Sequence, residues 1–392
     1  MNKYKELIDK KISEELESFV ELALAIHGNP ELGGVEFKTS ALLVDALKSR
    51  GWGVEYPYAG LPTAFNAVKK NGVGPVVDFM AEYDALPEIG HACGHNLNGV
   101  MSLLAGIALA DAIGDKLRGE IRVVGTPAEE TNGAKVEMAD RGVFDDVDFA
   151  MMAHASAGTM HPIYRSLALV PVEFSFKGLS SHAAAAPWDG LNALNALQLL
   201  FHALDMLRQH VRPETRIHGV ITKGGDAPNI VPDFTQACFY FRSPSRNYLD
   251  TVLEKAYDCA RGAALCTGTE VSWKHHETSF REILPNPEAE NQIMKVLDEM
   301  GMAYSQDPHS GGSTDVGDVS WRCPTLHIHM PFCEKYVAMH TREFAEITGD
   351  RRLIGKGIEG GARIIARMGL LVLTDSEARR KMMDDLNMAR KK

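Results

Sequence analysis

The run GHACGHN, residues 90–96, places His91, Cys93 and His95 within one short segment. Thiolates and imidazoles are preferred protein ligands of zinc and its neighbouring transition metals. Because only Gly94 separates Cys93 from His95, a loop can turn both side chains toward one cavity. A structural zinc knot would need a second compact pair, such as Cys-x-x-Cys, and the sequence has none. The spacing therefore favours a catalytic metal site.

Carboxylates and a further histidine follow other apolar segments. Asp84 comes after VVDFMA, Glu129 and Glu130 come after EIRVVGT, and His154 lies in DFAMMAHAS. Adjacent acids are common on solvated surfaces, but this pair directly follows an apolar run and a proline. One carboxylate of such a pair can bind a metal while the other holds a proton of bound water. Since open α/β sheets form their sites outside the carboxyl ends of the strands, we expect all these side chains to meet at one sheet edge.

The segments that must position these residues alternate between strand-like and helix-like patterns. Two helices come first, Lys5–His27 and the stretch TSALLVDALKSRG, with Thr39 or Ser40 as the expected N-cap of the second. The alternation that follows predicts an α/β fold with a mainly parallel sheet flanked by helices. Near Val170 the order changes to strand, helix, strand, strand, helix, strand, which is the ferredoxin-like pattern, with Asp189 as a plausible N-cap.

This change of pattern predicts two domains. Residues 1–168 and 280–392 form the α/β domain, and residues 169–279 form an inserted α+β domain. After the insertion the chain is expected to resume with a helix at 288–300, a glycine-rich loop, the strand PTLHIHMP and a helix at 351–373.

Composition and charge narrow the function classes. The chain of 392 residues is 45% hydrophobic with a formal net charge of −11, so it lacks the basic footprint of a nucleic-acid-binding protein. The N-terminal segment has no apolar leader, and no uninterrupted apolar run is long enough to span a membrane. Six scattered cysteines without a Cys-x-x-Cys pair are expected to be reduced. These features predict a cytoplasmic protein without a membrane or nucleic-acid partner.

Eight motifs occur in an order typical of one enzyme family: AEYDALPEIGHACGHN, PAEE, MMAHAS, GLSSHAAAAPWDGLNAL, APNIVPD, FRSPSR, GGSTDVGD and MHTREF. Over nearly its whole length the sequence resembles the zinc-dependent aminoacylase/carboxypeptidase family. The resemblance is to the amidohydrolase branch, which includes hippurate, auxin-conjugate and aminobenzoyl-glutamate hydrolases. It implies a di-metal exopeptidase-like α/β domain and an inserted ferredoxin-like lid that mediates homodimerisation.

The resemblance also implies a role for each residue of the site. Asp84 corresponds to an acid that orients a ligand, and Glu129 to the general base. His327 and His329, on one face of the strand LHIHM, are rivals for the last ligand, but the motif HTREF selects His340. Two divalent ions are implied, zinc first and manganese or cobalt as alternatives. The implied ligands are Cys93 as the bridging thiolate, His95, Glu130, His154 and His340.

The inserted domain carries further implied site residues. His182 corresponds to a histidine that reaches the partner subunit's site and stabilises the oxyanion, although an ordinary turn histidine is the alternative. Asn229 and Arg242 correspond to positions that hold the free carboxylate of the substrate, a task that suits the bidentate arginine fork. Ser313 lies in SGGSTDVGD, residues 310–318, which either presents N–H groups to an anion or forms a flexible turn.

Two departures from the branch bear on the substrate. Glu82 and Asn96 stand where many members have aspartate, and both variants resemble the aminobenzoyl-glutamate hydrolase and dipeptidase-like sub-branch. The resemblance thus predicts metal-dependent hydrolysis of the amide bond of an N-acyl or N-aroyl amino acid with a free carboxylate. A dipeptidase with the same site is the alternative. A non-catalytic binding protein with this fold is the alternative of another class, and the retained Glu129 and ligand set argue against it.

Overall fold

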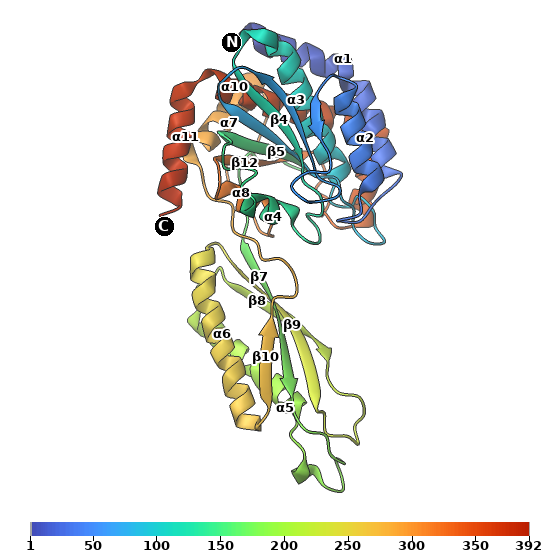
Figure 1. Ribbon diagram of the computed structural model, residues 1–392, viewed down its shortest axis with the longest axis vertical. Helices are drawn as coiled ribbons and strands as arrows, with labels where there is room; N and C mark the ends of the chain where they lie inside the picture. Colours follow the sequence, from blue (N-terminus) through green and yellow to red (C-terminus); the bar gives the residue numbers. More distant parts are fainter. Residues whose placement is uncertain (1, 392) are drawn as a thin grey trace. The chain divides into compact units, whose positions relative to one another are not determined.

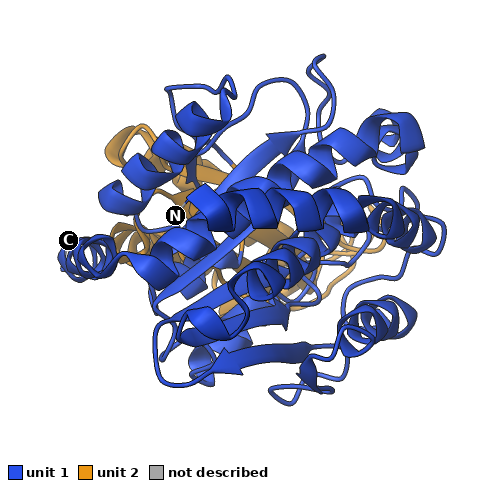
Figure 2. Cartoon of the chain, turned by 90° about the horizontal axis from the view of Figure 1, so that it is seen from above, with its two compact units in different colours: residues 1–165, 283–311, 315–392 blue, residues 166–282, 312–314 orange. Residues whose placement is uncertain are grey.

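The computed structural model describes residues 2–391 and divides into two compact units (Figure 2). Unit 1 comprises Met1–Arg165, Ile283–Gly311 and Asp315–Lys392, and unit 2 comprises Ser166–Glu282 and Gly312–Thr314. The predicted insertion, residues 169–279, lies inside unit 2. The short return of the chain at Gly312–Thr314 was not predicted, because no composition change marks it.

Unit 1 is built on a six-stranded sheet with the order β1-β2-β4-β3-β5-β12 (Figure 1). Strands β4, β3, β5 and β12 run parallel, as predicted, whereas β1 and β2 are antiparallel additions at one edge. The strands are β1 (Gly53–Glu55), β2 (Phe65–Asn71), β3 (Val76–Ala81), β4 (Gly119–Gly125), β5 (Phe149–Ser156) and β12 (Thr325–Pro331).

Helices cover both faces of this sheet because its strands alternate two apolar faces. Val77 and Phe79 of β3 join the larger core, whereas Met80 joins a smaller one. The larger core is packed by α1 (Asn2–His27), α2 (Phe37–Lys48), α3 (His95–Ile113), α7 (Pro287–Met300), α9 (Arg342–Gly349), α10 (Arg351–Thr374) and α11 (Ser376–Ala389). The smaller core is packed by α4 (Ala134–Asp140) and α8 (Val316–Ser320).

Helix α3 is buried on nearly every side. Among the described residues, only His95–Lys116 has the length and apolar composition of a membrane-crossing helix. In unit 1, however, 83% of its apolar window is buried, because α3 packs against β3 and β5 as well as α1 and α10. The core of the unit therefore accounts for its apolar character.

The start of α2 differs from the prediction. The helix begins at Phe37 with Glu36 at the N-cap position, so Thr39 and Ser40 lie inside its first turn. The Thr39 amide and hydroxyl donate to the Glu31 carboxylate at 2.8 and 2.9 Å. A carboxylate from the preceding loop thus replaces the expected local cap.

Unit 2 has a four-stranded antiparallel sheet with the order β10-β7-β9-β8 and two helices. This is the predicted ferredoxin-like arrangement. The first helix is capped by Asn192, which accepts from the amides of Leu194 and Asn195, so the predicted cap Asp189 was wrong. The elements are β7 (Ala168–Lys177), α5 (Ala193–Leu207), β8 (Arg216–Lys223), β9 (Phe234–Ser243), α6 (Arg246–Thr267) and β10 (Glu270–Lys274).

Candidate active site

The carboxyl ends of the parallel strands of unit 1 bring the predicted chemistry together. Strands β3, β4 and β5 run in one direction, so the segments that follow them emerge at the same edge of the sheet. The N-terminus of α3 lies at this edge too, since it follows the loop after β3. The side chains that meet there are Asp84, Cys93, His95, Glu129, Glu130 and His154.

The turn before α3 requires a glycine. Gly94 has a φ of +85°, and a Cβ atom at this position would lie 2.6 Å from the Cβ of Ala155. Both the left-handed backbone and the close approach exclude larger residues. The turn at Gly94 lets Cys93 and His95 face the same group of side chains, as their spacing predicted.

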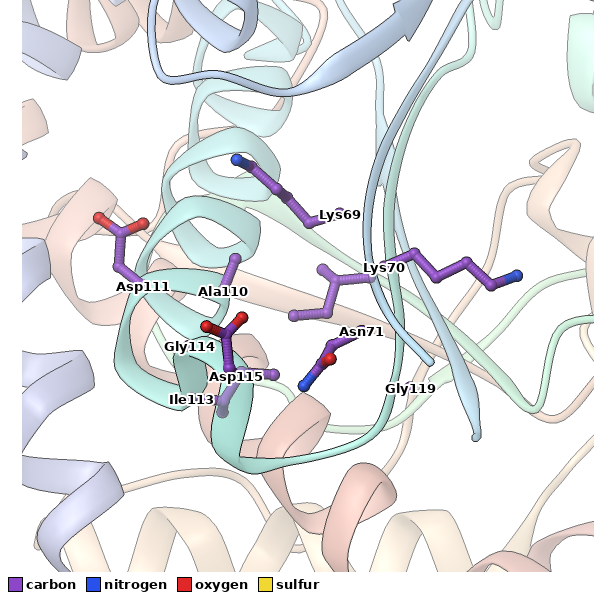
Figure 3. A pocket seen from close by; sticks show the side chains of 10 residues that line it. Lys69, Lys70, Asn71, Ala110, Asp111, Ile113, Gly114, Asp115 and Gly119 are labelled. Carbon is purple, nitrogen blue, oxygen red and sulfur yellow. The ribbon is translucent and has the colours of Figure 1, made fainter. Parts of the chain in front are cut away.

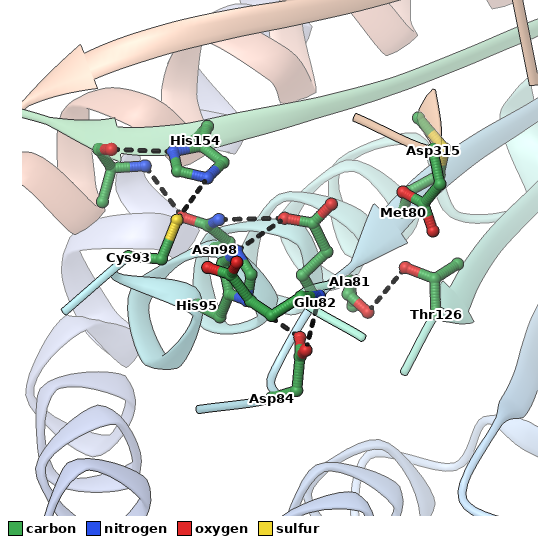
Figure 4. A network of polar contacts seen from close by, with 12 residues as sticks. Met80, Ala81, Glu82, Asp84, Cys93, His95, Asn98, Thr126, His154 and Asp315 are labelled. Carbon is green, nitrogen blue, oxygen red and sulfur yellow. Dashed lines mark hydrogen bonds and ion pairs between the residues drawn. The ribbon is translucent and has the colours of Figure 1, made fainter. Parts of the chain in front are cut away.

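Two groups of possible metal ligands share the Cys93 thiol. One contains Cys93, His95 and His154, and the other contains Cys93, Glu130 and His340. Within each group the ligand atoms all lie within 4.8 Å of one another. The Cys93 Sγ is 3.5 Å from the His154 Nε2, and the His340 Nε2 is 3.2 Å from the Glu130 Oε1. The structure therefore gathers all five predicted ligands around one sulfur. Figure 4 shows Cys93, His95 and His154 of this set.

The ligand atoms are oriented as a metal site requires. The Nδ1 of His95 donates to the Asp84 Oδ1 at 2.8 Å, and the Nδ1 of His154 donates to the Ala155 carbonyl at 2.8 Å. These bonds turn the Nε2 atoms toward the cluster, which is how partners of metal-bound histidines act. The buried Nε2 of His95 lacks a hydrogen-bond partner among the described residues. Such an unsatisfied buried atom fits a bound cation.

Charges in the cluster separate the two adjacent glutamates. Burial raises the pKa of Glu129 well above its usual value, and the nearby carboxyls of Glu82, Asp315 and Glu130 raise it further. Burial also opposes ionisation of Glu130, but the hydrogen bond from His340 and the charge of His95 lower its pKa to about 2. Burial lowers the pKa of His154 to about 4. Glu129 thus favours holding a proton, whereas Glu130 favours the charged form that binds metals.

A buried lysine lies behind the ligands and was not predicted. Lys135 of α4 places its Nζ 2.7 Å from the Glu82 Oε1 and 2.8 Å from the Asp315 Oδ1. All three side chains are inaccessible to solvent. Glu82, Glu129 and Asp315 also lie close enough to hold a cation, but the Lys135 ammonium already supplies the positive charge there. This group is therefore a salt-bridge network beside the metal ligands.

The rival histidines of β12 lie close to His154. The ring centroids of His327 and His329 are 5.4 and 5.3 Å from that of His154. Neither residue belongs to a ligand group among the described residues, whereas His340 does. Burial lowers the pKa of His327 to about 3. The geometry thus favours His340 as the fifth ligand.

Two other residues of the opening motif, Asn96 and His91, are not among the ligands. Asn96 donates to the carbonyls of Ala23 and Thr348 at 3.3 and 3.0 Å, so its amide ties the start of α3 to α1 and α9. These hydrogen bonds give Asn96 a structural role. The sequence pattern had instead related Asn96 to the choice of substrate. His91 is buried and belongs to no ligand group of the described chain.

The predicted site residues of unit 2 form two pairs. His182 pairs with Ile230 in a β-bridge next to Asn229, and the Ala183 amide donates to the Asn229 carbonyl at 3.0 Å. The His182 Nδ1 accepts from the amides of Ala184 and Ala185, so the neutral ring carries its proton on Nε2. This exposed imidazole therefore presents an N–H donor.

The second pair lies near the other end of β9. The Arg242 Nη1 donates to the Ser313 Oγ at 2.9 Å. Phe234 begins β9, and with a rise of about 3.3 Å per residue Arg242 lies roughly 26 Å further along the strand. The pairing of β7 continues past Phe234, since the Gly178 amide donates to the Asp233 carbonyl and the Val231 amide donates to the Ser181 carbonyl. His182 and Asn229 therefore lie beyond Phe234 in the opposite direction. Within one chain the two pairs cannot contact the same small molecule.

A cavity of about 480 Å³ in unit 1 lies away from the ligand cluster (Figure 3). Its lining comes from the end of β2, the end of α3 and the start of β4. These segments mark the amino edge of the parallel strands, opposite the edge that carries Cys93. The cavity therefore does not contribute to the candidate active site.

Comparisons with known proteins identify the family. The family model described as peptidase family M20/M25/M40 matches residues 79–366. A mouse Xaa-Arg dipeptidase is 34% identical over 88% of this chain and 84% of its own length. One of the subunits of the p-aminobenzoyl-glutamate hydrolase of Escherichia coli is 28% identical over 94% of this chain and 92% of its own length.

This chain belongs to the M20/M25/M40 peptidase family. As the sequence predicted, it is a hydrolase that acts on amide or peptide bonds.

Solved structures support the fold. An aminobenzoyl-glutamate utilization protein from Klebsiella pneumoniae has a TM-score of 0.70 at 18% identity, covering 94% of this chain and 99% of that one. A dinuclear metal binding peptidase from Bacillus subtilis has a TM-score of 0.68 at 17% identity, covering 91% and 99%. The predicted α/β fold is thus shared with solved structures, one of which is a peptidase of this family.

Proposed function

We propose that this peptidase cleaves the amide bond between an acyl, aroyl or aminoacyl group and an amino acid with a free carboxylate. The observation that carries the proposal is the pair of ligand groups that share Cys93, with Glu129 beside them. The names of two relatives, Xaa-Arg dipeptidase and p-aminobenzoyl-glutamate hydrolase, both describe an amide bond to an amino acid. Their shared chemistry supports the substrate class.

The five clustered side chains would hold two divalent metal ions. Cys93 belongs to both ligand groups, and a thiolate with imidazoles and one carboxylate favours zinc. A solved relative in fold is described as a dinuclear metal binding peptidase. When bound, such ions would polarise the scissile carbonyl and lower the pKa of a bound water toward about 7.

Glu129 moves the proton in this mechanism. Its carboxylate takes a proton from the attacking water and delivers it to the leaving nitrogen. Burial and, after it, the neighbouring acids raise the pKa of Glu129, which brings the carboxyl nearer to the pH at which a general base works well. Asp84 holds both the His95 ring and the Glu130 amide, so it keeps the ligands in place during the reaction.

Unit 2 would carry the groups that bind the substrate. A homodimer would provide these groups from two copies of the chain. Arg242 would bind the free carboxylate beside Ser313, while the His182 N–H and Asn229 would contact the region of the reacting carbonyl. Because these pairs lie at opposite ends of β9, a site that uses both needs two copies of the chain. The edge strand β8, with Val220 and Ile221 exposed, offers a surface for a second copy.

A substrate panel tests the proposed class. The purified protein, analysed for metals, is assayed with aminobenzoyl-glutamate, N-acyl amino acids and dipeptides ending in arginine. Each substrate is compared with its C-terminal amide, in which the carboxylate charge is absent. We expect hydrolysis of the acids and weak hydrolysis of the amides. Equal rates on both forms would contradict recognition of a free carboxylate, and preference for dipeptides would establish the dipeptidase alternative.

Paired variants test the catalytic assignment. Glu129→Gln should lower kcat by about 10²–10⁴-fold while the metal content stays near that of the wild type. Glu130→Gln should lose metal instead, since Glu130 is a proposed ligand. The reverse outcome would show that the two glutamates have exchanged roles.

A further inference from the structure

A buried glutamate outside the ligand set contacts the loop of the catalytic carboxylates. Glu36, between α1 and α2, is inaccessible to solvent. Its Oε1 accepts the Ala128 amide at 2.7 Å, and its Oε2 accepts the Thr63 hydroxyl at 2.8 Å. A buried carboxylate is costly unless hydrogen bonds compensate it, so these two contacts are specific features of the fold.

Ala128 has a backbone conformation that needs external support. Its φ is +57°, in the left-handed region that non-glycine residues adopt rarely. Such conformations persist where the surrounding structure holds them, often at functional sites. Ala128 directly precedes Glu129, so a change in its backbone angles would move this carboxylate, whereas Glu130 is held separately through its amide by the Asp84 carboxylate at 2.9 Å. The bond from Glu36 therefore acts on the backbone that aims Glu129.

The same N-terminal segment also holds the loop that carries Asp84. The Ala85 amide donates to the Glu31 carbonyl at 2.8 Å, and the Tyr83 hydroxyl donates to the Thr63 carbonyl at 2.7 Å. Asp84 in turn accepts the Glu130 amide at 2.9 Å. Glu36 and Thr63 thus connect the loop after β3 with the loop after β4.

Close packing accompanies these bonds. A Cβ atom on Gly33 would lie 2.9 Å from the Ala128 Cα, so the segment before α2 lies directly against the loop after β4. A larger residue at Gly33 would displace Ala128, and the glycine leaves room for the contact.

We propose that Glu36 is a positioning residue that aims Glu129 by holding Ala128 in its left-handed conformation. This inference rests on the proposed role of Glu129 as the general base. Glu36 touches neither the ligands nor the residues proposed to bind substrate. Its loss should therefore lower kcat and leave KM and metal content near the wild-type values.

Three variants test the bond itself. Glu36→Ala removes the acceptor and should lower kcat by about 10–100-fold, because a misplaced general base loses part of the roughly 10²–10⁴-fold that such a base contributes. Glu36→Gln keeps an oxygen acceptor for the Ala128 amide and should stay within about threefold of the wild type. Adding Ala128→Gly to Glu36→Ala should restore part of kcat, because glycine adopts positive φ without support.

A matched control separates positioning from stability. Glu31→Ala removes a half-buried carboxylate of the same segment, which binds the first turn of α2 through Thr39. It should lower the melting temperature with little effect on kcat. If Glu36→Gln is as slow as Glu36→Ala, and Ala128→Gly gives no rescue, the positioning role is wrong. The positioning role is also wrong if Glu31→Ala and Glu36→Ala both lose kcat in proportion to their fall in melting temperature.

A double-mutant cycle distinguishes this inference from the proposed function. In a Glu129→Gln background, Glu36→Ala should have little further effect on kcat, because the group that it positions is gone. An undiminished further loss would overturn the role of Glu36 and leave the base assignment standing. Full activity of Glu129→Gln alone would refute the proposed function instead.

Discussion

Asp84 offers a sharp test of how the ligand cluster is held together. One oxygen of its buried carboxylate accepts from the His95 Nδ1 at 2.8 Å, and the other accepts from the Glu130 amide at 2.9 Å. Asparagine has nearly the same shape but only one acceptor oxygen. In Asp84→Asn, one of the two N–H donors must therefore face an NH2 group.

The expected effect follows from the lost bond. A hydrogen bond to a charged group contributes about 1.5–3 kcal/mol, and about 1.4 kcal/mol corresponds to tenfold in an equilibrium constant. Because both donors belong to proposed ligands, the loss should appear in metal affinity. We expect Asp84→Asn to weaken metal binding by about 10–100-fold, the range found for partners of metal-bound histidines.

Competition with a chromophoric zinc chelator measures this affinity. Asp78→Asn is the matched control, since Asp78 is another buried carboxylate from the same part of the chain but contacts no proposed ligand. The control should bind zinc as the wild type does. If Asp84→Asn also keeps wild-type affinity, the ligands do not depend on Asp84 and this account of the cluster is wrong.

Three further perturbations probe other parts of the structure. Burial raises the pKa of Asp78 to about 8 from an unfolded value near 3.9, so folding binds a proton and stability should fall as pH rises between these values. Asp78→Asn should flatten that fall in a pH series of melting temperatures, and an unchanged slope would contradict it. Lys135→Met leaves the buried Glu82 and Asp315 without their cation and should lower the free energy of unfolding in urea by about 3–5 kcal/mol, whereas unchanged stability would refute the network. In steady-state assays, Arg242→Ala should raise KM for carboxylate substrates by about tenfold or more and leave kcat nearly unchanged, because a charged hydrogen bond contributes about 1.5–3 kcal/mol. An unaltered KM would show that Arg242 does not bind the substrate.

Much of the candidate site could be predicted because it follows from strand direction. Glu129, Glu130 and His154 come at the ends of apolar runs, and parallel strands bring such ends to one edge. That Cys93 and His95 face the same cavity could also be predicted, because a single glycine separates them. His340 was different, because only the resemblance of its motif separated it from the histidines of β12.

Other features depend on contacts that no local pattern records. Glu36 precedes a helix, and its importance comes from the positive φ of Ala128, which is distant in sequence. Lys135 stands on a short helix where a lysine is usually solvated, yet Glu82 and Asp315 enclose it. The antiparallel pairing of β1 and β2 was likewise hidden, since an apolar pattern marks a strand without giving the direction of its neighbour.

The central claim is that five side chains hold two metal ions around one thiolate. Anomalous diffraction from crystals of the zinc-loaded protein, recorded on both sides of the zinc absorption edge, locates the ions directly. We expect two peaks per chain, both in contact with the five proposed ligands, which are Cys93, His95, Glu130, His154 and His340. A single peak, or peaks among Glu82, Glu129 and Asp315 in place of this set, would contradict the account.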